Sequence, residues 1–191
     1  MRIMLIVAGL GLLVVLVNAG CAAVRAGYDT APYKMLRHEG RFEVRQYPDL
    51  MLVSTPLKGS DGSFMRLFRY IQGQNEARKK IAMTTPVFME RGASNGMMAF
   101  VLPATLQSGE APVPTGPEVA LRTLPGGRYA VLRFSGGMNE SRERRQLARL
   151  RDWLAAAGLK TLEEPVFGYF DPPWTPPFMR RNEVMLRLVA D

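Results

Sequence analysis

Two clusters in this chain combine apolar side chains with arginine, residue types that offer apolar contact area and hydrogen bonds to a carboxylate. The first contains Met65, Arg66, Arg69 and Tyr70 within an apolar stretch. If the apolar residues of this stretch form a helix face against a core, Met65 and Arg69 share a neighbouring face, because positions i and i+4 lie on one side. The alternative is that Met65 fills the helix edge and the arginines are solvated charges.

The second cluster lies in a proline-rich segment near the C-terminus and contains Trp174, Phe178, Arg180 and Arg181. Prolines make such a loop rigid, the two aromatic rings offer stacking area, and either arginine can pair with a carboxylate through two hydrogen bonds. The alternative is a structural loop whose aromatic side chains plug the end of a sheet.

Other site chemistry has little support. The chain has one cysteine, Cys21, and one histidine, His38, so an intrachain disulfide and a metal site with two imidazoles are excluded. His38 is expected to be an exposed loop residue, and a G-x-S-x-G nucleophile motif is missing from the sequence. Only His38, Glu43 and Tyr70 are candidates for acid–base work, and we therefore expect a binding protein without catalysis, with the metal ligand left open.

The elements that must position these clusters form two similar halves. Each half is predicted to contain two strands, a helix and two further strands, which makes a single α+β domain with two amphipathic helices. Asp61 or Ser63 is expected to cap the first helix and Gly73 to end it, while Asn139 caps the second and Gly158 follows it. The expected strands are 42–47, 50–55, 80–89 and 97–102 in the first half and 119–123, 129–134, 166–169 and 183–189 in the second, with helices at 64–71 and 140–157.

The N-terminal residues are typical of a secretion signal. A basic start precedes an apolar run over 3–17, and small residues then precede Cys21, as in a bacterial lipobox in which the thiol is lipidated. We expect residues 1–20 to be a signal peptide, residues 21–32 a tether, and residues 33–191 one domain outside the cytoplasm, held at a membrane. The alternative is an uncleaved membrane anchor, since residues 3–24 carry no charge.

The formal net charge of +8 favours anionic partners such as lipid headgroups, nucleic acid or carboxylate-bearing small molecules. An exported location argues against nucleic acid.

Several segments together resemble the SOUL haem-binding protein family, in the family's order and over most of the chain. They are 42–47 (FEVRQY), 70–75 (YIQGQN), 80–87 (KIAMTTPV), 168–174 (GYFDPPW) and 180–184 (RRNEV).

The resemblance implies a curved antiparallel eight-stranded sheet or distorted barrel with two helices. It also implies non-covalent binding of haem or another tetrapyrrole in a shallow apolar cleft, and it favours a ligand-contacting role for the basic residues of the first helix. One position departs from the family pattern: Gln46 stands where an axial histidine has been proposed in a eukaryotic branch.

The expected function is therefore sequestration or transport of a tetrapyrrole by Met65, Arg66, Arg69, Tyr70, Trp174, Phe178 and Arg181. A binder of another amphipathic anion is the main alternative, and an enzyme acting on a tetrapyrrole or an ester is a weaker one.

Overall fold

The computed structural model describes residues 27–57, 62–91, 96–106, 110–162 and 164–190. The segment expected to be a signal peptide and Cys21 lie outside the described residues. No helix within those ranges is long and apolar enough to span a membrane.

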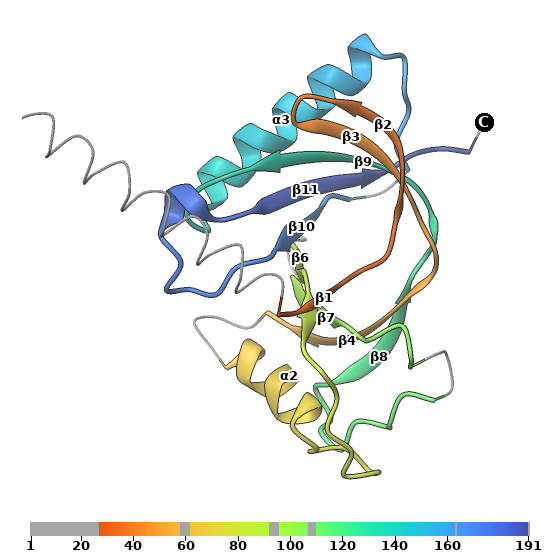
Figure 1. Cartoon of the computed structure of the whole chain (residues 1–191), viewed down its shortest axis with the longest axis vertical. Helices are drawn as coiled ribbons and strands as arrows, with labels where there is room; N and C mark the ends of the chain where they lie inside the picture. Colours follow the sequence, from red (N-terminus) through yellow and green to blue (C-terminus); the bar gives the residue numbers. More distant parts are fainter. Residues whose placement is uncertain (1–26, 58–61, 92–95, 107–109, 163, 191) are drawn as a thin grey trace, which may run out of the picture.

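The main element is a curled nine-stranded antiparallel sheet with strand order β2-β3-β9-β11-β10-β6-β7-β4-β8 (Figure 1). Two further short strands, β1 (Asp29–Thr30) and β5 (Thr84–Thr85), pair in parallel. The strands of the large sheet are β2 (Lys34–Glu39), β3 (Phe42–Tyr47), β4 (Leu50–Pro56), β6 (Val87–Glu90), β7 (Met97–Val101), β8 (Ala120–Leu124), β9 (Gly127–Phe134), β10 (Val166–Tyr169) and β11 (Asn182–Arg187).

The sheet order confirms that the chain consists of two related halves. The first half runs β3-β4-α2-β6-β7 and the second runs β8-β9-α3-β10-β11. In the two halves, β3 corresponds to β8, β4 to β9, β6 to β10 and β7 to β11. If each strand between β3 and β8 is replaced by its counterpart, the same strand order results, read in the opposite direction. The two halves meet at the pair β6–β10, and each half supplies a strand to the other, since β3 pairs with β9 and β4 with β8.

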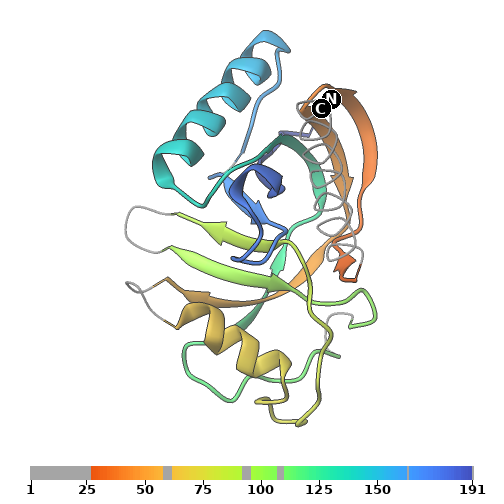
Figure 2. The same ribbon diagram turned by 60° about the vertical axis from the view of Figure 1, so that its left-hand side comes forward.

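Two helices pack on one face of the sheet, at its opposite ends (Figures 1 and 2). Helix α2 (Ser63–Ile71) lies against β4 and β7, and helix α3 (Glu140–Ala156) lies against β9 and β11. Because side chains alternate along a strand, the sheet buries two layers. One layer packs with the helices through Leu67, Ile71, Leu150 and Leu154, and the other fills the inside of the curl.

The expected helix ends are mostly confirmed. The side-chain oxygen of Asn139 accepts a hydrogen bond from the Arg142 N–H at 3.2 Å, and Gly158 follows α3 with a φ of 66°. Gly73, with a φ of 106°, follows α2. The prediction of Ser63 as a cap is wrong, because Gly62 occupies that position and the Ser63 hydroxyl donates to the Pro56 carbonyl instead. Asp61 lies outside the described residues.

Three differences from the expected elements have physical reasons. Strand β2 was not predicted, because all six of its residues are exposed and no apolar alternation marks it as a strand. It forms one edge of the sheet and carries charged side chains, as edge strands commonly do. The strand expected over 80–89 is instead β5 and β6 separated by Pro86, which has no N–H for a ladder.

The packed domain also begins earlier than Tyr33. Asp29 and Thr30 pair with β5, and Ala31 is buried inside the curl. Part of the segment expected to be a tether is therefore a component of the fold.

The contact between α3 and the sheet can be tested at Leu150, which is fully buried. We expect Leu150→Ala to lower the free energy of unfolding by about 2–5 kcal/mol, because it leaves a cavity under the helix. Leu162→Ala is the matched control: the Leu162 side chain is 54% exposed, so its loss is expected to change stability by less than about 0.5 kcal/mol. Urea denaturation measures both, and equal effects would contradict the assignment of Leu150 to the core.

Candidate ligand-binding site

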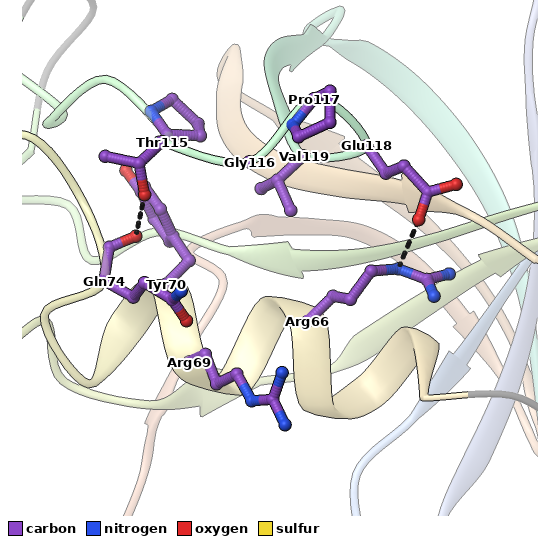
Figure 3. A pocket seen from close by; sticks show the side chains of 10 residues that line it. Arg66, Arg69, Tyr70, Gln74, Thr115, Gly116, Pro117, Glu118 and Val119 are labelled. Carbon is purple, nitrogen blue, oxygen red and sulfur yellow. Dashed lines mark hydrogen bonds and ion pairs between the residues drawn. The ribbon is translucent and has the colours of Figure 1, made fainter.

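A pocket of about 220 Å³ lies between α2 and the segment 114–119 (Figure 3). Three residues of the first predicted cluster, Arg66, Arg69 and Tyr70, line it together with Val119. The pocket is held closed at one end by a hydrogen bond of 3.2 Å from the Thr115 hydroxyl to the Gln74 carbonyl. The structure thus brings most of the first cluster to one cavity.

Arg66 fixes the start of α2 to its neighbours. Its guanidinium donates to the Thr55 hydroxyl and to the Pro56 carbonyl, each at 3.0 Å, and lies 3.6 Å from a Glu118 carboxylate oxygen. With these partners, Arg66 has less freedom to bind a ligand carboxylate than the sequence suggested.

Arg69 and Met65 form the accessible part of this helix. Met65 is 46% exposed, one turn before the exposed Arg69. Within the described residues the Arg69 guanidinium makes no hydrogen bond or ion pair, and in Figure 3 it extends freely from the helix. An unpaired guanidinium beside an exposed thioether can meet both the acidic edge and the apolar face of one ligand.

Tyr70 presents its ring to the pocket but not a free hydroxyl. It is 1% exposed, and its hydroxyl donates to the Pro112 carbonyl at 2.7 Å. Burial raises the pKa of Tyr70 to about 12. Its contribution is therefore a fixed wall that ties α2 to the segment carrying the rest of the lining.

The second predicted cluster lies on the segment 170–181, which runs between the two helices in both views (Figures 1 and 2). Trp174 is 80% exposed and Phe178 is 72% exposed, so the alternative in which they plug the sheet is wrong. Neither residue lines the α2 pocket. Arg180 holds the loop by donating to the Thr175 carbonyl at 2.7 Å, and Arg181 pairs with Glu183.

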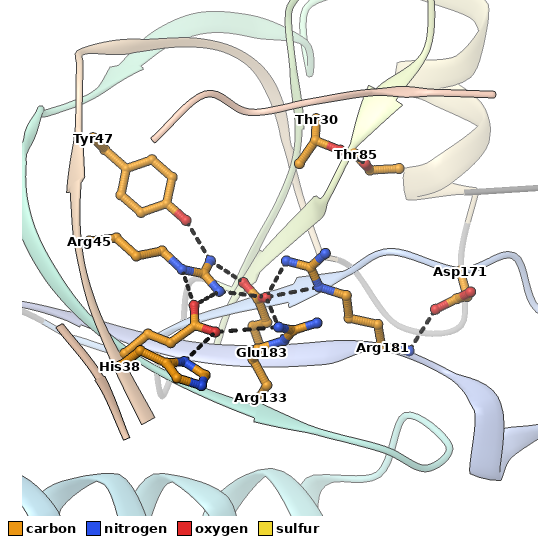
Figure 4. A network of polar contacts seen from close by, with 10 residues as sticks. Thr30, His38, Arg45, Tyr47, Thr85, Arg133, Asp171, Arg181 and Glu183 are labelled. Atoms are coloured by element: carbon orange, nitrogen blue, oxygen red, sulfur yellow. Dashed lines mark hydrogen bonds and ion pairs between the residues drawn. The ribbon is translucent and has the colours of Figure 1, made fainter. Parts of the chain in front are cut away.

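A buried ion network on the inner face of the sheet was not predicted (Figure 4). Arg45 is fully buried and donates to Glu43 at 2.6 Å, to the Tyr47 hydroxyl at 2.9 Å and to both oxygens of Glu183 at 2.7 and 2.9 Å. The Tyr33 ring packs 4.2 Å from its guanidinium carbon. The available signal was the alternation Glu43, Arg45, Tyr47, which places all three on one face of a predicted strand.

Two more arginines complete the network from its outer side. Arg181 donates to Glu183 at 2.7 Å, and Arg133 donates to Glu43 at 3.3 Å. Burial raises the pKa of Glu183, but hydrogen bonds and charge from Arg45, together with those from Arg181, lower it overall below its ordinary value. Burial likewise lowers the pKa of Arg45, and Glu183 more than reverses this effect. Both groups are therefore ionised at neutral pH.

His38 and Gln46 are both outside the α2 pocket. His38 is exposed, as expected, but it lies on β2 and not in a loop, with Nδ1 3.7 Å from a Glu43 oxygen. Gln46 is exposed on β3, where its amide contacts the Tyr47 carbonyl at 3.4 Å. In the described part of the chain no three His, Cys, Asp or Glu side chains gather as a metal site.

Comparison with known proteins identifies the family. The family model described as SOUL heme-binding protein matches residues 28–187, and the chain belongs to this family. Mouse (Mus musculus) heme-binding protein 2 is 29% identical over 172 residues, covering 82% of each chain. Human (Homo sapiens) heme-binding protein 2 is 29% identical over 185 residues, covering 88% of each chain.

Solved structures share the fold at low sequence identity. The C-terminal domain of EcmrR has a TM-score of 0.58 at 10% identity, covering 83% of this chain and 99% of that one. A hydrolase from Listeria innocua has a TM-score of 0.57 at 10% identity, covering 80% of this chain and 94% of that one. At such identity the likeness concerns the fold alone.

The buried network predicts a specific pH dependence. Glu183→Gln is expected to lower the free energy of unfolding by about 3–5 kcal/mol at pH 7, because it removes a charge that pairs with the buried Arg45. Since the native pKa of Glu183 is below its ordinary value of 4.5, the carboxylate stabilises the fold above about pH 4.5, and this contribution is lost as the pH falls through the native pKa. The difference between variant and parent should therefore shrink on acidification.

Urea denaturation between pH 7 and pH 3 measures this difference. The control is Glu76→Gln, which removes an exposed carboxylate and should change stability by less than about 0.5 kcal/mol. A destabilisation by Glu183→Gln that stays constant with pH would contradict the role given to the carboxylate charge.

Proposed function

We propose that this protein binds haem or a related tetrapyrrole, without catalysis, at the α2 pocket, and that it sequesters or carries this ligand. Membership of the SOUL heme-binding family supports the ligand class. The observation that carries the assignment to this pocket is the Arg69 guanidinium, which has no partner among the described residues and lies beside the exposed Met65. Together they supply a cation for a propionate and an apolar contact for the macrocycle.

The size of the pocket limits how such a ligand lies. Its volume of about 220 Å³ is below the roughly 300–1,000 Å³ of a typical ligand pocket. A tetrapyrrole is therefore held by one edge in the cavity, with much of its face along the outside of α2. Phe64, which is 42% exposed, adds apolar area on that helix.

The residues present fit the acidic edge and the apolar face of haem better than its iron. Met65 is the one exposed thioether on α2, the Tyr70 hydroxyl is hydrogen-bonded, and His38 lies on β2. Haem, when bound, supplies a redox-active iron and a large flat ring. Recognition by this chain is expected to depend on the ring and its carboxylates, with thioether ligation by Met65 as an addition.

Parallel titrations with ferric haem, metal-free protoporphyrin and its dimethyl ester test the proposal. The full-length chain in non-ionic detergent is followed by Soret absorbance and tryptophan fluorescence, with empty micelles as the blank. We expect saturable binding of haem and protoporphyrin, and Arg69→Ala should weaken both by about tenfold, because it removes one charge-assisted hydrogen bond. The ester should bind parent and variant alike.

The matched control is Arg151→Ala, which removes an exposed arginine from α3 and should leave affinity within about twofold of the parent. Met65→Ala should weaken haem more than protoporphyrin if its sulfur contacts iron. No saturable binding of any porphyrin would overturn the proposal and favour a different amphipathic anion. Equal losses in Arg69→Ala and Arg151→Ala would remove the assignment to the α2 pocket.

We also propose that the domain is tethered outside the cytoplasm through a lipid on Cys21. The supporting features are the apolar run that precedes the cysteine and the small residues directly before it. Two or more acyl chains anchor a protein stably, since each buried CH₂ contributes about 0.8 kcal/mol.

Metabolic labelling with a fatty acid in a bacterial host tests the tether. The parent should incorporate label and sediment with membranes, whereas Cys21→Ser should lose the label. Sedimentation of unlabelled parent would indicate the uncleaved anchor instead, and a soluble parent without label would contradict both forms of attachment.

A further inference from the structure

A second cleft, separate from the α2 pocket, is lined by four arginines. It has a volume of about 290 Å³ and lies between the β2–β3 turn, the end of β9 and the segment 179–181. Its cationic residues are Arg41, Arg133, Arg180 and Arg181, and none of the described residues that line it carries a carboxylate. We propose that this cleft binds a small multivalent oxyanion, a polycarboxylate or a polyphosphate.

The four guanidinium groups come from three elements of the fold, the β2–β3 turn, β9 and the segment 179–181. Arg41 lies in the two-residue turn between β2 and β3, where Gly40 adopts a φ of 60°. The Arg41 carbonyl accepts a hydrogen bond of 2.9 Å from the Arg133 N–H, which attaches the turn to the end of β9. The backbone of the turn is therefore held at a fixed place beside the end of β9.

Two of the arginines keep their charge uncompensated. Arg41 is exposed and makes no side-chain hydrogen bond or ion pair within the described residues. Arg180 donates only to neutral acceptors there, the carbonyls of Thr175 and Pro173. These carbonyls hold the guanidinium in place without neutralising it.

The other two arginines face buried carboxylates on one side and the cleft on the other. Arg133 and Arg181 pair with Glu43 and Glu183, whose side chains are each 1% exposed, whereas the arginine side chains are 43% and 21% exposed (Figure 4). Within the described residues, Nη2 of Arg133 and Nη1 of Arg181 make no hydrogen bond. Donors directed outward from an already fixed ion network are suited to a second, external acceptor.

The charge balance favours an anion with more than one negative group. Arg45 and the four lining arginines give five positive charges. The nearby carboxylates of Glu43, Glu183 and Asp171 give three negative charges, and Asp171 accepts a hydrogen bond of 2.6 Å from the Arg181 N–H. The excess of two positive charges matches a dianion or trianion. Met179 and Phe134, both largely buried, form an apolar part of the wall, which a carbon-based polycarboxylate can contact.

The test is isothermal titration calorimetry of the full-length chain with two probes, citrate and inorganic pyrophosphate, at 0.15 M salt. Stoichiometric binding of at least one probe supports the proposal, and their relative affinities distinguish a carboxylate site from a phosphate site. Arg41→Ala should weaken the preferred probe by about tenfold and Arg41→Glu should abolish binding, because the charge that faces the anion is removed or reversed. The fold should be kept, since the Arg41 side chain makes no hydrogen bond or ion pair within the described residues.

Arg151→Ala is the matched control, since it removes the same charge from the exposed side of α3 and should leave citrate and pyrophosphate affinity within about twofold. Thermal unfolding of each variant checks that the fold is retained. Binding of neither probe, or equal weakening by Arg41→Ala and Arg151→Ala, would overturn the proposal. Because the two pockets share no lining residue, failure of porphyrin binding leaves this test unaffected.

Discussion

A buried guanidinium imposes the strictest constraint on this fold. Arg45 is withdrawn from water on the inner face of the sheet, and an unpaired charge there costs more than a single domain tolerates. Its partners come from β3 itself and from β11, 138 residues later, so the ion network is satisfied only when both halves are assembled. The outer arginines then attach to the same carboxylates, which fixes the 170–181 segment and one wall of the basic cleft.

The pattern of apolar residues was sufficient to predict the two halves, both helices and the strands that carry a buried face. This pattern did not predict strands or contacts in which burial is unrelated to the apolar or polar type of the residue. Strand β2 has no buried side, and the ion network buries Glu43, Arg45 and Glu183, whose types are typical of a surface. The pairing of β3 with β9 is a long-range choice that local periodicity does not encode.

The candidate site was partly accessible from the sequence. Helical spacing placed Met65 and Arg69 on one accessible face, which the structure retains. It did not reveal that Arg66 donates hydrogen bonds to Thr55 and Pro56. Nor did it reveal the hydrogen bond from Tyr70 to Pro112. These partners lie outside the helix, where helical spacing gives no information. The exposed positions of Trp174 and Phe178 were likewise not evident from residue type, and Arg180 and Arg181 hold their loop by hydrogen bonds to Thr175 and Asp171.

The exchange of strands between the halves also determines the order in which the fold can be completed. During synthesis β3 emerges long before its partner β9, and β6 emerges long before β10, so the first half exists for a time with open sheet edges. Contacts this distant along the chain make folding slow and leave nascent strands prone to association with other chains. The polypeptide therefore reaches its native sheet only after β11 is available, and until then its sheet edges stay unpaired.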